Sequence, residues 1–174
     1  MSNYLDSVSK FHDAFEHPIE IEIKEDNLEL RELRLSLLFE EIVELSFAMG
    51  TNKKLRELIA KFQDTINENP VKYDKVETVD ALGDMQYVLS GGVLAMGYTN
   101  VFDLCFDEIQ RSNMSKMCAT KQEAEDTIKY YKEERGETAE MHIIEKNGNF
   151  IVKRADGKIL KNMYYSPANL EQFI

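Results

Sequence analysis

Residues 75–96 read KVETVDALGDMQYVLSGGVLAM, and this stretch decides the fold class. Apolar residues recur in it at intervals of three and four, which is the period of an α-helix, and they occur on nearly every side of the helix. A helix that is apolar all round is typical of a central element. Gly97 follows directly and is a favourable C-terminal cap. The sequence therefore predicts a long, central helix here.

The segments on both sides of this helix have the same period. Helices are predicted for residues 28–49 and 53–67 before it and for residues 101–111 after it, and a first helix ends before Pro18. Together these elements suffice for a helical bundle. We expect a mainly α fold, with residues 1–120 as one helical domain.

The character of the chain changes beyond residue 120. A charged helix is predicted over residues 122–134, and two short strands, 141–145 and 150–153, flank the dipeptide Asn147-Gly148. This dipeptide is a strong signal for a type I′ hairpin turn. Because a single hairpin is marginally stable, it should pack against the helices or a neighbouring subunit. Residues 121–174 are therefore predicted to form an appendage made of a helix and a β-hairpin.

Composition excludes several classes of protein. The net charge of −11 over 174 residues disfavours nucleic acid as a partner, since phosphate backbones bind clusters of Lys and Arg. Apolar runs stay well short of the roughly 20 residues that span a bilayer, and the first residues do not resemble a signal peptide. We expect no membrane association and a cytoplasmic location, where the two cysteines, Cys105 and Cys118, stay thiols.

Acidic side chains interrupt the apolar stripe of the helix predicted over residues 28–49. Glu41 and Glu44 project onto the middle of that stripe, and Glu40 lies about 100° to one side. A glutamate pair on a helix is usually solvated. On an inner face, however, ionised carboxylates are costly unless they are paired or bind a metal. The stripe therefore indicates a cation site beside this helix.

The helix over residues 75–96 repeats this pattern. Asp80 and Asp84 share a face with apolar residues, and Glu77 lies close beside them. Ion pairs with Lys or Arg are the structural alternative. A set of ligands made only of oxygen favours Mg²⁺ or Mn²⁺ over zinc or copper. Two acidic helices that face each other could then bind a polyphosphate through metal ions.

A polar segment, QRSNMSKM, occupies residues 110–117. Its side chains suit phosphate, ribose or base, and the candidates for substrate binding are Arg111, Asn113 and Lys116. The alternative is an ordinary helix end, where a cation is favoured by the helix dipole and Asp107 can pair with Arg111 four residues later. The sequence alone leaves both interpretations open.

Three stretches together resemble a known family. EEIVEL at residues 40–45, VDALGDMQYVLSGGVLAMG at 79–97 and FDEIQRSNMSKM at 106–117 are similar to the MazG-like and phosphoribosyl-ATP-pyrophosphohydrolase-like group of all-α NTP pyrophosphatases. The last 21 residues, 154–174, also resemble the end of some members. The resemblance implies Mg²⁺-dependent cleavage of a nucleoside triphosphate to monophosphate and pyrophosphate, in homodimers or homotetramers whose sites lie among helices.

The resemblance also implies roles for particular residues. The family's ExxE pair matches Glu41 and Glu44, with Glu40 as a neighbouring acid. The second pair, ExxD in the family, matches less well and is either Glu77 with Asp80 or Asp80 with Asp84, because Ala81 stands three residues before Asp84. The substrate residues match as Asn113 and Lys116, with Arg111 assisting.

The leading hypothesis is hydrolysis between the α and β phosphates, with Glu40 or Glu41 as the base that activates water. A nucleotide- or metal-sensing bundle without turnover is the alternative. A structural module with solvated acids is the third possibility. The base and sugar of the nucleotide cannot be read from the sequence.

Overall fold

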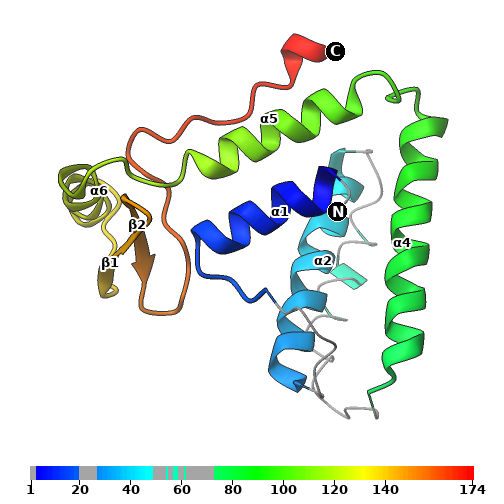
Figure 1. Cartoon of the computed structure of the whole chain (residues 1–174), viewed down its shortest axis with the longest axis horizontal. Coiled ribbons are helices and arrows are strands. Elements are labelled where there is room, and N and C mark those ends of the chain that lie inside the picture. Colours follow the sequence, from blue (N-terminus) through cyan, green and yellow to red (C-terminus); the bar gives the residue numbers. More distant parts are fainter. Residues whose placement is uncertain (1–2, 20–26, 49–53, 55–56, 59–60, 62–72) are drawn as a thin grey trace. The chain divides into compact units, whose positions relative to one another are not determined.

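The computed structural model describes residues 3–19, 27–48, 54, 57–58, 61 and 73–174 of the chain (Figure 1). Its helices and strands, in chain order, are α1 (Asn3–Ala14), α2 (Leu28–Ala48), α4 (Lys75–Ala95), α5 (Phe102–Met114), α6 (Lys121–Glu133), β1 (Met141–Lys146), β2 (Asn149–Arg154) and the 3₁₀ turn η1 (Glu171–Phe173). The prediction of a mainly α fold with a C-terminal β-hairpin is confirmed. The helix predicted over residues 53–67 lies outside the described residues, apart from a few isolated positions. None of the helices described is both long enough and apolar enough to cross a membrane.

The chain divides into two compact units. One contains Met1–Ile21 and Gln86–Ile174, and the other contains Glu22–Met85. The predicted domain boundary after residue 120 falls within the first unit. The division into domains 1–120 and 121–174 therefore stays a prediction. α2 and the first half of α4 belong to the second unit, whereas α1, α5, α6 and the hairpin belong to the first.

Local capping explains where the helices of the second unit begin. The Asn27 side-chain oxygen accepts a hydrogen bond from the backbone N–H of Leu30 at 3.0 Å. Asp74 caps α4 in the same way, since its carboxylate accepts from the N–H of Val76 at 2.9 Å and of Glu77 at 3.2 Å. These bonds satisfy N–H groups that a helix leaves free in its first turn.

In the first unit α1 packs along α5. The Tyr4 ring meets the Phe106 ring edge to face, with 4.6 Å between centroids, and the Tyr4 hydroxyl donates to the Asp103 carboxylate. The Gln110 amide donates to the Ser7 carbonyl at 2.9 Å. Aromatic packing and these polar contacts fix α1 on α5.

The hairpin is stabilised by α6 and by the segment before it. β1 and β2 pair in antiparallel register from Met141 opposite Arg154 to Lys146 opposite Asn149. The turn places Asn147 at φ 52° and Gly148 at φ 76°, as a type I′ turn requires, so the sequence-based prediction is confirmed. A small core of Cys118, Ala124, Val152 and Leu160 lies between these elements. The predicted packing of the hairpin against a helix is therefore correct.

α5 continues farther than predicted. It ends at Met114, so Ser112 and Asn113 lie in its last turn and not in a loop. The Ser115 N–H bonds to the carbonyls of Arg111 and Ser112, and the Ser115 hydroxyl donates to the Ser112 carbonyl at 2.7 Å. These bonds satisfy carbonyls at the helix end, which is why the helix extends through a polar segment.

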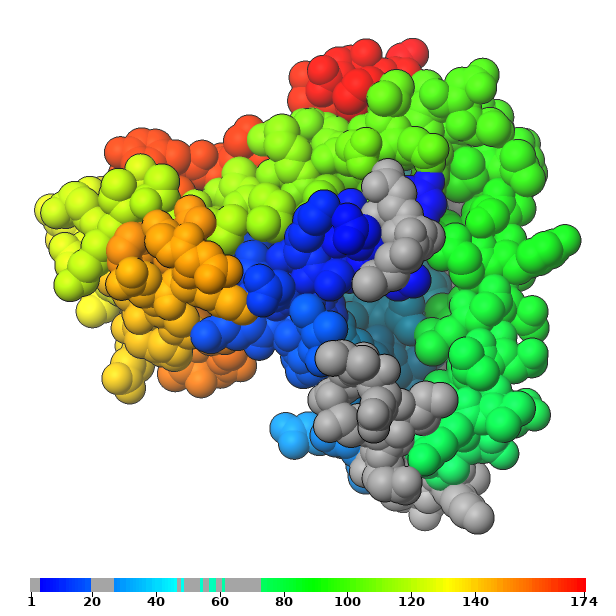
Figure 2. All heavy atoms as spheres, in the orientation of Figure 1, coloured from blue at the N-terminus to red at the C-terminus, as the bar shows by residue number. Residues whose placement is uncertain are grey.

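α4 is long, as predicted, but it is not central in the single chain. None of its residues is buried, and Val76, Tyr87 and Val88 are 72%, 81% and 72% exposed. Its side chains, in green, stand at the surface in Figure 2. The apolar pattern correctly shows that the helix needs a partner surface, but periodicity cannot tell whether that surface belongs to the same chain.

Candidate functional site

The predicted metal ligands lie on two helices of the second unit and are exposed. α2 carries Glu40, Glu41 and Glu44, and α4 carries Glu77, Asp80 and Asp84. The expectation that these acids lie in the core of the bundle is wrong for the single chain. The cause is the one that exposes the apolar residues of α4: no described part of this chain covers these helix faces.

The single chain does not assemble a complete cation site from these acids. Within the described ranges, no three His, Cys, Asp or Glu side chains converge closely enough to hold a metal ion. The donors themselves suit a hard divalent cation, because every one is a carboxylate. The chemistry of the donor set therefore fits Mg²⁺ or Mn²⁺, and convergence would require more than the described part of one chain.

Asn113 and Lys116 lie together at the end of α5, as predicted. The Lys116 ammonium donates to the Asn113 side-chain oxygen at 2.9 Å and lies 5.5 Å from the centroid of the Phe11 ring. Both polar residues are half-buried. Burial lowers the pKa of Lys116, and the charge of Lys161 lowers it further, while Tyr165 raises it.

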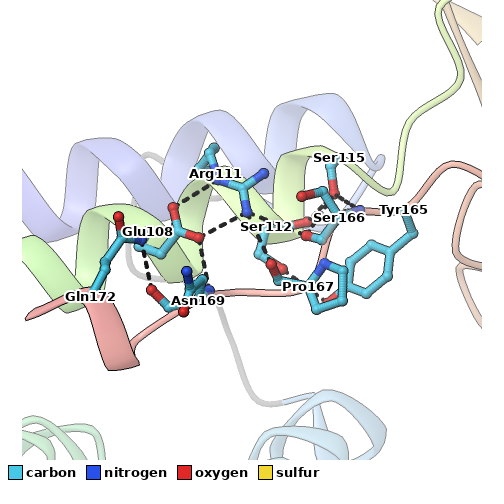
Figure 3. A network of polar contacts seen from close by, with 9 residues as sticks. All are labelled: Glu108, Arg111, Ser112, Ser115, Tyr165, Ser166, Pro167, Asn169 and Gln172. Carbon is cyan, nitrogen blue, oxygen red and sulfur yellow. Dashed lines mark hydrogen bonds and ion pairs between the residues drawn. The ribbon is translucent and has the colours of Figure 1, made fainter. Parts of the chain in front are cut away.

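Arg111 makes contacts of a different kind (Figure 3). Its guanidinium forms a bidentate ion pair with Glu108, at 2.7 and 2.9 Å, and donates to the carbonyls of Ser166 and Pro167 at 3.4 and 3.1 Å. The helix partner is thus Glu108, three residues before Arg111, and not Asp107. Arg111 ties α5 to the C-terminal tail, residues 161–174, which follows the hairpin.

Further bonds continue this attachment along the tail. The hydroxyls of Ser112 and Tyr165 lie 2.9 Å apart, and the Ser166 N–H donates to the Ser115 hydroxyl at 3.0 Å. The Glu108 carboxylate also accepts the N–H of Asn169 at 2.9 Å. Hydrogen bonds from Arg111 and from this N–H lower the pKa of Glu108 to about 2. The tail is held on the helix that carries the predicted substrate residues.

Sequence reasoning missed Glu108, Lys161 and Tyr165. A signal existed for Glu108, because an acid three residues before an arginine on a helix can pair with it. For Lys161 and Tyr165 the sequence holds no comparable signal, because these residues are far from α5 in the sequence and only the folded tail brings them near it.

Comparison with known proteins identifies relatives. Residues 8–113 match the model of the phosphoribosyl-ATP pyrophosphohydrolase family. A protein of Acanthamoeba polyphaga mimivirus is 32% identical over 130 residues, which is 69% of this chain and 50% of that protein. The chain thus spans about half the length of this relative.

A crystal structure from Exiguobacterium sp. 255-15, described as a candidate NTP pyrophosphohydrolase, has the same fold. Its TM-score is 0.62 at 20% sequence identity, with 98% of this chain and 92% of the other covered. At this identity the likeness establishes the fold. The matched region, residues 8–113, contains both acidic helices and Asn113. The chain belongs to the phosphoribosyl-ATP pyrophosphohydrolase family, as the sequence predicted.

Proposed function

We propose that the protein is a divalent-metal-dependent nucleoside triphosphate pyrophosphohydrolase. Water attacks the α-phosphorus, the bond from that phosphorus to the bridging oxygen breaks, and the products are a nucleoside monophosphate and pyrophosphate. The observation that carries this proposal is the family match over residues 8–113, because it spans all the predicted metal ligands and catalytic acids.

In this proposal Mg²⁺ or Mn²⁺ binds among Glu41, Glu44, Glu77, Asp80 and Asp84. The metal supplies charge neutralisation for the phosphates when it is bound. Glu40 or Glu41 accepts the proton of the attacking water, and Asn113 with Lys116 binds the substrate. Which acids of α4 form the second pair is left open between Glu77 with Asp80 and Asp80 with Asp84.

The proposed working form is a homodimer or homotetramer. The many exposed apolar side chains of α4 support it, since a helix that exposes large apolar residues favours a partner surface. A second copy that covers α4 would also exclude water from Asp80 and Asp84, which lie on the same helix. Acids that are exposed in one chain would then lie inside the assembly.

Product analysis tests the proposal. The full chain is incubated with a panel of NTPs and dNTPs plus Mg²⁺, and at least one should yield the monophosphate and pyrophosphate in equal amounts. Glu44→Gln should abolish turnover, whereas Glu125→Gln, the same change at an exposed position on α6, should not affect it. A diphosphate product, or an intact bound nucleotide after long incubation, would refute the proposal, and the latter would support a sensor.

A further inference from the structure

Lys116 is a half-buried cation at the end of α5. Its ammonium contacts the Asn113 side-chain oxygen and the Phe11 ring. Among the residues that the structure describes, no acid lies within 4.0 Å of this ammonium. In a chain with a net charge of −11, a partly desolvated lysine that lacks an acid is a candidate for binding an anion from outside.

The C-terminal tail places a second cation close to it. The Lys161 ammonium lies over the Tyr165 ring, 4.4 Å from the centroid, and likewise pairs with no acid in the described ranges. The next residue, Asn162, donates its N–H to the Lys116 carbonyl at 3.2 Å and its amide to the Met117 carbonyl at 2.9 Å. The backbone that carries Lys161 is therefore bonded to the backbone that carries Lys116.

The tail that carries Lys161 is fixed beside Lys116 by hydrogen bonds. The tail stays in place through the bonds of Tyr165 to Ser112 and of Arg111 to Glu108, Ser166 and Pro167. Two lysines on hydrogen-bonded segments, neither paired with a described acid, leave a site that attracts an anion.

We infer that Lys116 and Lys161 form a binding site for a phosphoryl anion such as pyrophosphate or the polyphosphate of a nucleotide. The inference rests on the proposed function and adds Lys161 to the substrate site. Lys161 lies beyond the family-matched residues 8–113, so the tail contributes a contact that the family match does not cover. Arg111 is then a residue that positions the tail, since its guanidinium bonds to Glu108 and to the Pro167 carbonyl.

The test measures pyrophosphate binding by calorimetry in the presence of a chelator, so that metal bound by α2 and α4 plays no part. Lys161→Met keeps a side chain of similar length but removes the charge, and it should weaken binding about tenfold or more. Lys158→Met is the matched control, because Lys158 is exposed and three residues earlier on the same segment. It should bind as the unaltered protein does, and Lys161→Arg should retain binding.

Three results would overturn the inference: no pyrophosphate binding by the unaltered protein, unchanged binding by Lys161→Met, or equal weakening by Lys158→Met. Circular dichroism checks that each variant folds, and Lys161→Gln is a second variant that removes the charge. If pyrophosphate binding depends on Lys161 but no nucleotide is hydrolysed, this inference holds and the proposed function is wrong. If a nucleotide is hydrolysed but pyrophosphate binding does not depend on Lys161, the proposed function holds and this inference is wrong.

Discussion

Arg154, at the end of β2, is shared by two carboxylates. It donates to Asp156 at 2.6 and 3.0 Å and to Glu137 at 2.8 Å. The hydrogen bonds from Arg154 lower the pKa of Asp156 from 3.8 to about 2, and backbone N–H of Ala139 together with Arg154 lowers the pKa of Glu137. A carboxylate whose pKa falls on folding stabilises the native state above its unfolded pKa, and this stabilisation is lost as pH falls through its folded pKa.

We therefore predict a pH-dependent effect of Asp156→Asn. The variant should melt at a lower temperature than the unaltered protein above pH 3.8, and the difference should shrink as the pH falls towards about 2. Thermal melts followed by circular dichroism over this range measure it. In an Arg154→Gln background the effect of Asp156→Asn should be smaller at every pH, because the partner is gone. A pH-independent difference would contradict the assignment.

Glu108 should control how firmly the tail is bound to α5. Glu108→Gln removes the charge that holds Arg111 and that accepts the Asn169 N–H. Charge-assisted hydrogen bonds are roughly twice as strong as neutral ones, so the amide of Asn169 should exchange with deuterium several-fold faster. Glu125→Gln, which disrupts only the exposed pair with Lys121 at 3.8 Å, is the control. Equal exchange in Glu108→Gln and the unaltered protein would show that the tail is held by other bonds.

For single residues, the sequence predicts which side chains belong to the site better than it predicts which residues they contact. Asn113 and Lys116 are together, as the polar segment suggested. Arg111 contacts Ser166 and Pro167, more than fifty residues later in the chain. Spacing along a helix cannot indicate such a contact, because it depends on the route of the tail.

The elements themselves follow local rules. Gly148 adopts φ 76°, a conformation that L side chains rarely adopt, and a Cβ at this position would meet no heavy atom within 4 Å. Gly148→Ala should therefore destabilise the fold by conformational strain alone, by about 1 kcal/mol in urea denaturation. Gly148→Asn should cost less, since asparagine tolerates this conformation. An alanine variant as stable as the unaltered protein would mean that the turn changes type.

Helix positions were predicted to within a few residues wherever an apolar period coincided with a cap. α2 begins at Leu28 and α4 at Lys75, as expected from the sequence. α5 was predicted too short, because its last turn consists of polar residues and lacks the apolar period that marks a helix.

For the whole molecule, the main question is what covers α4. Val88 is 72% exposed in the single chain. If a second copy packs there, Val88→Lys buries a charge at the interface and should convert the assembly to a smaller species in sedimentation or light scattering. Gln122→Lys, on the exposed face of α6, should leave the mass unchanged. A monomeric unaltered protein would contradict the proposed assembly.

The mainly α class, the hairpin with its turn, and the acidic helices that mark the family could all be predicted from the sequence, because they depend on period, capping and residue type within short stretches. The return of the tail to α5, its attachment through Arg111 and the bond of Asn162 to the Lys116 carbonyl could be seen only in the folded chain. The fold also placed the acids and the apolar residues of α4 on the surface of the single chain. The apolar period of a helix indicates that one of its faces favours burial. It cannot indicate which surface covers that face, because this depends on contacts between distant segments or between chains.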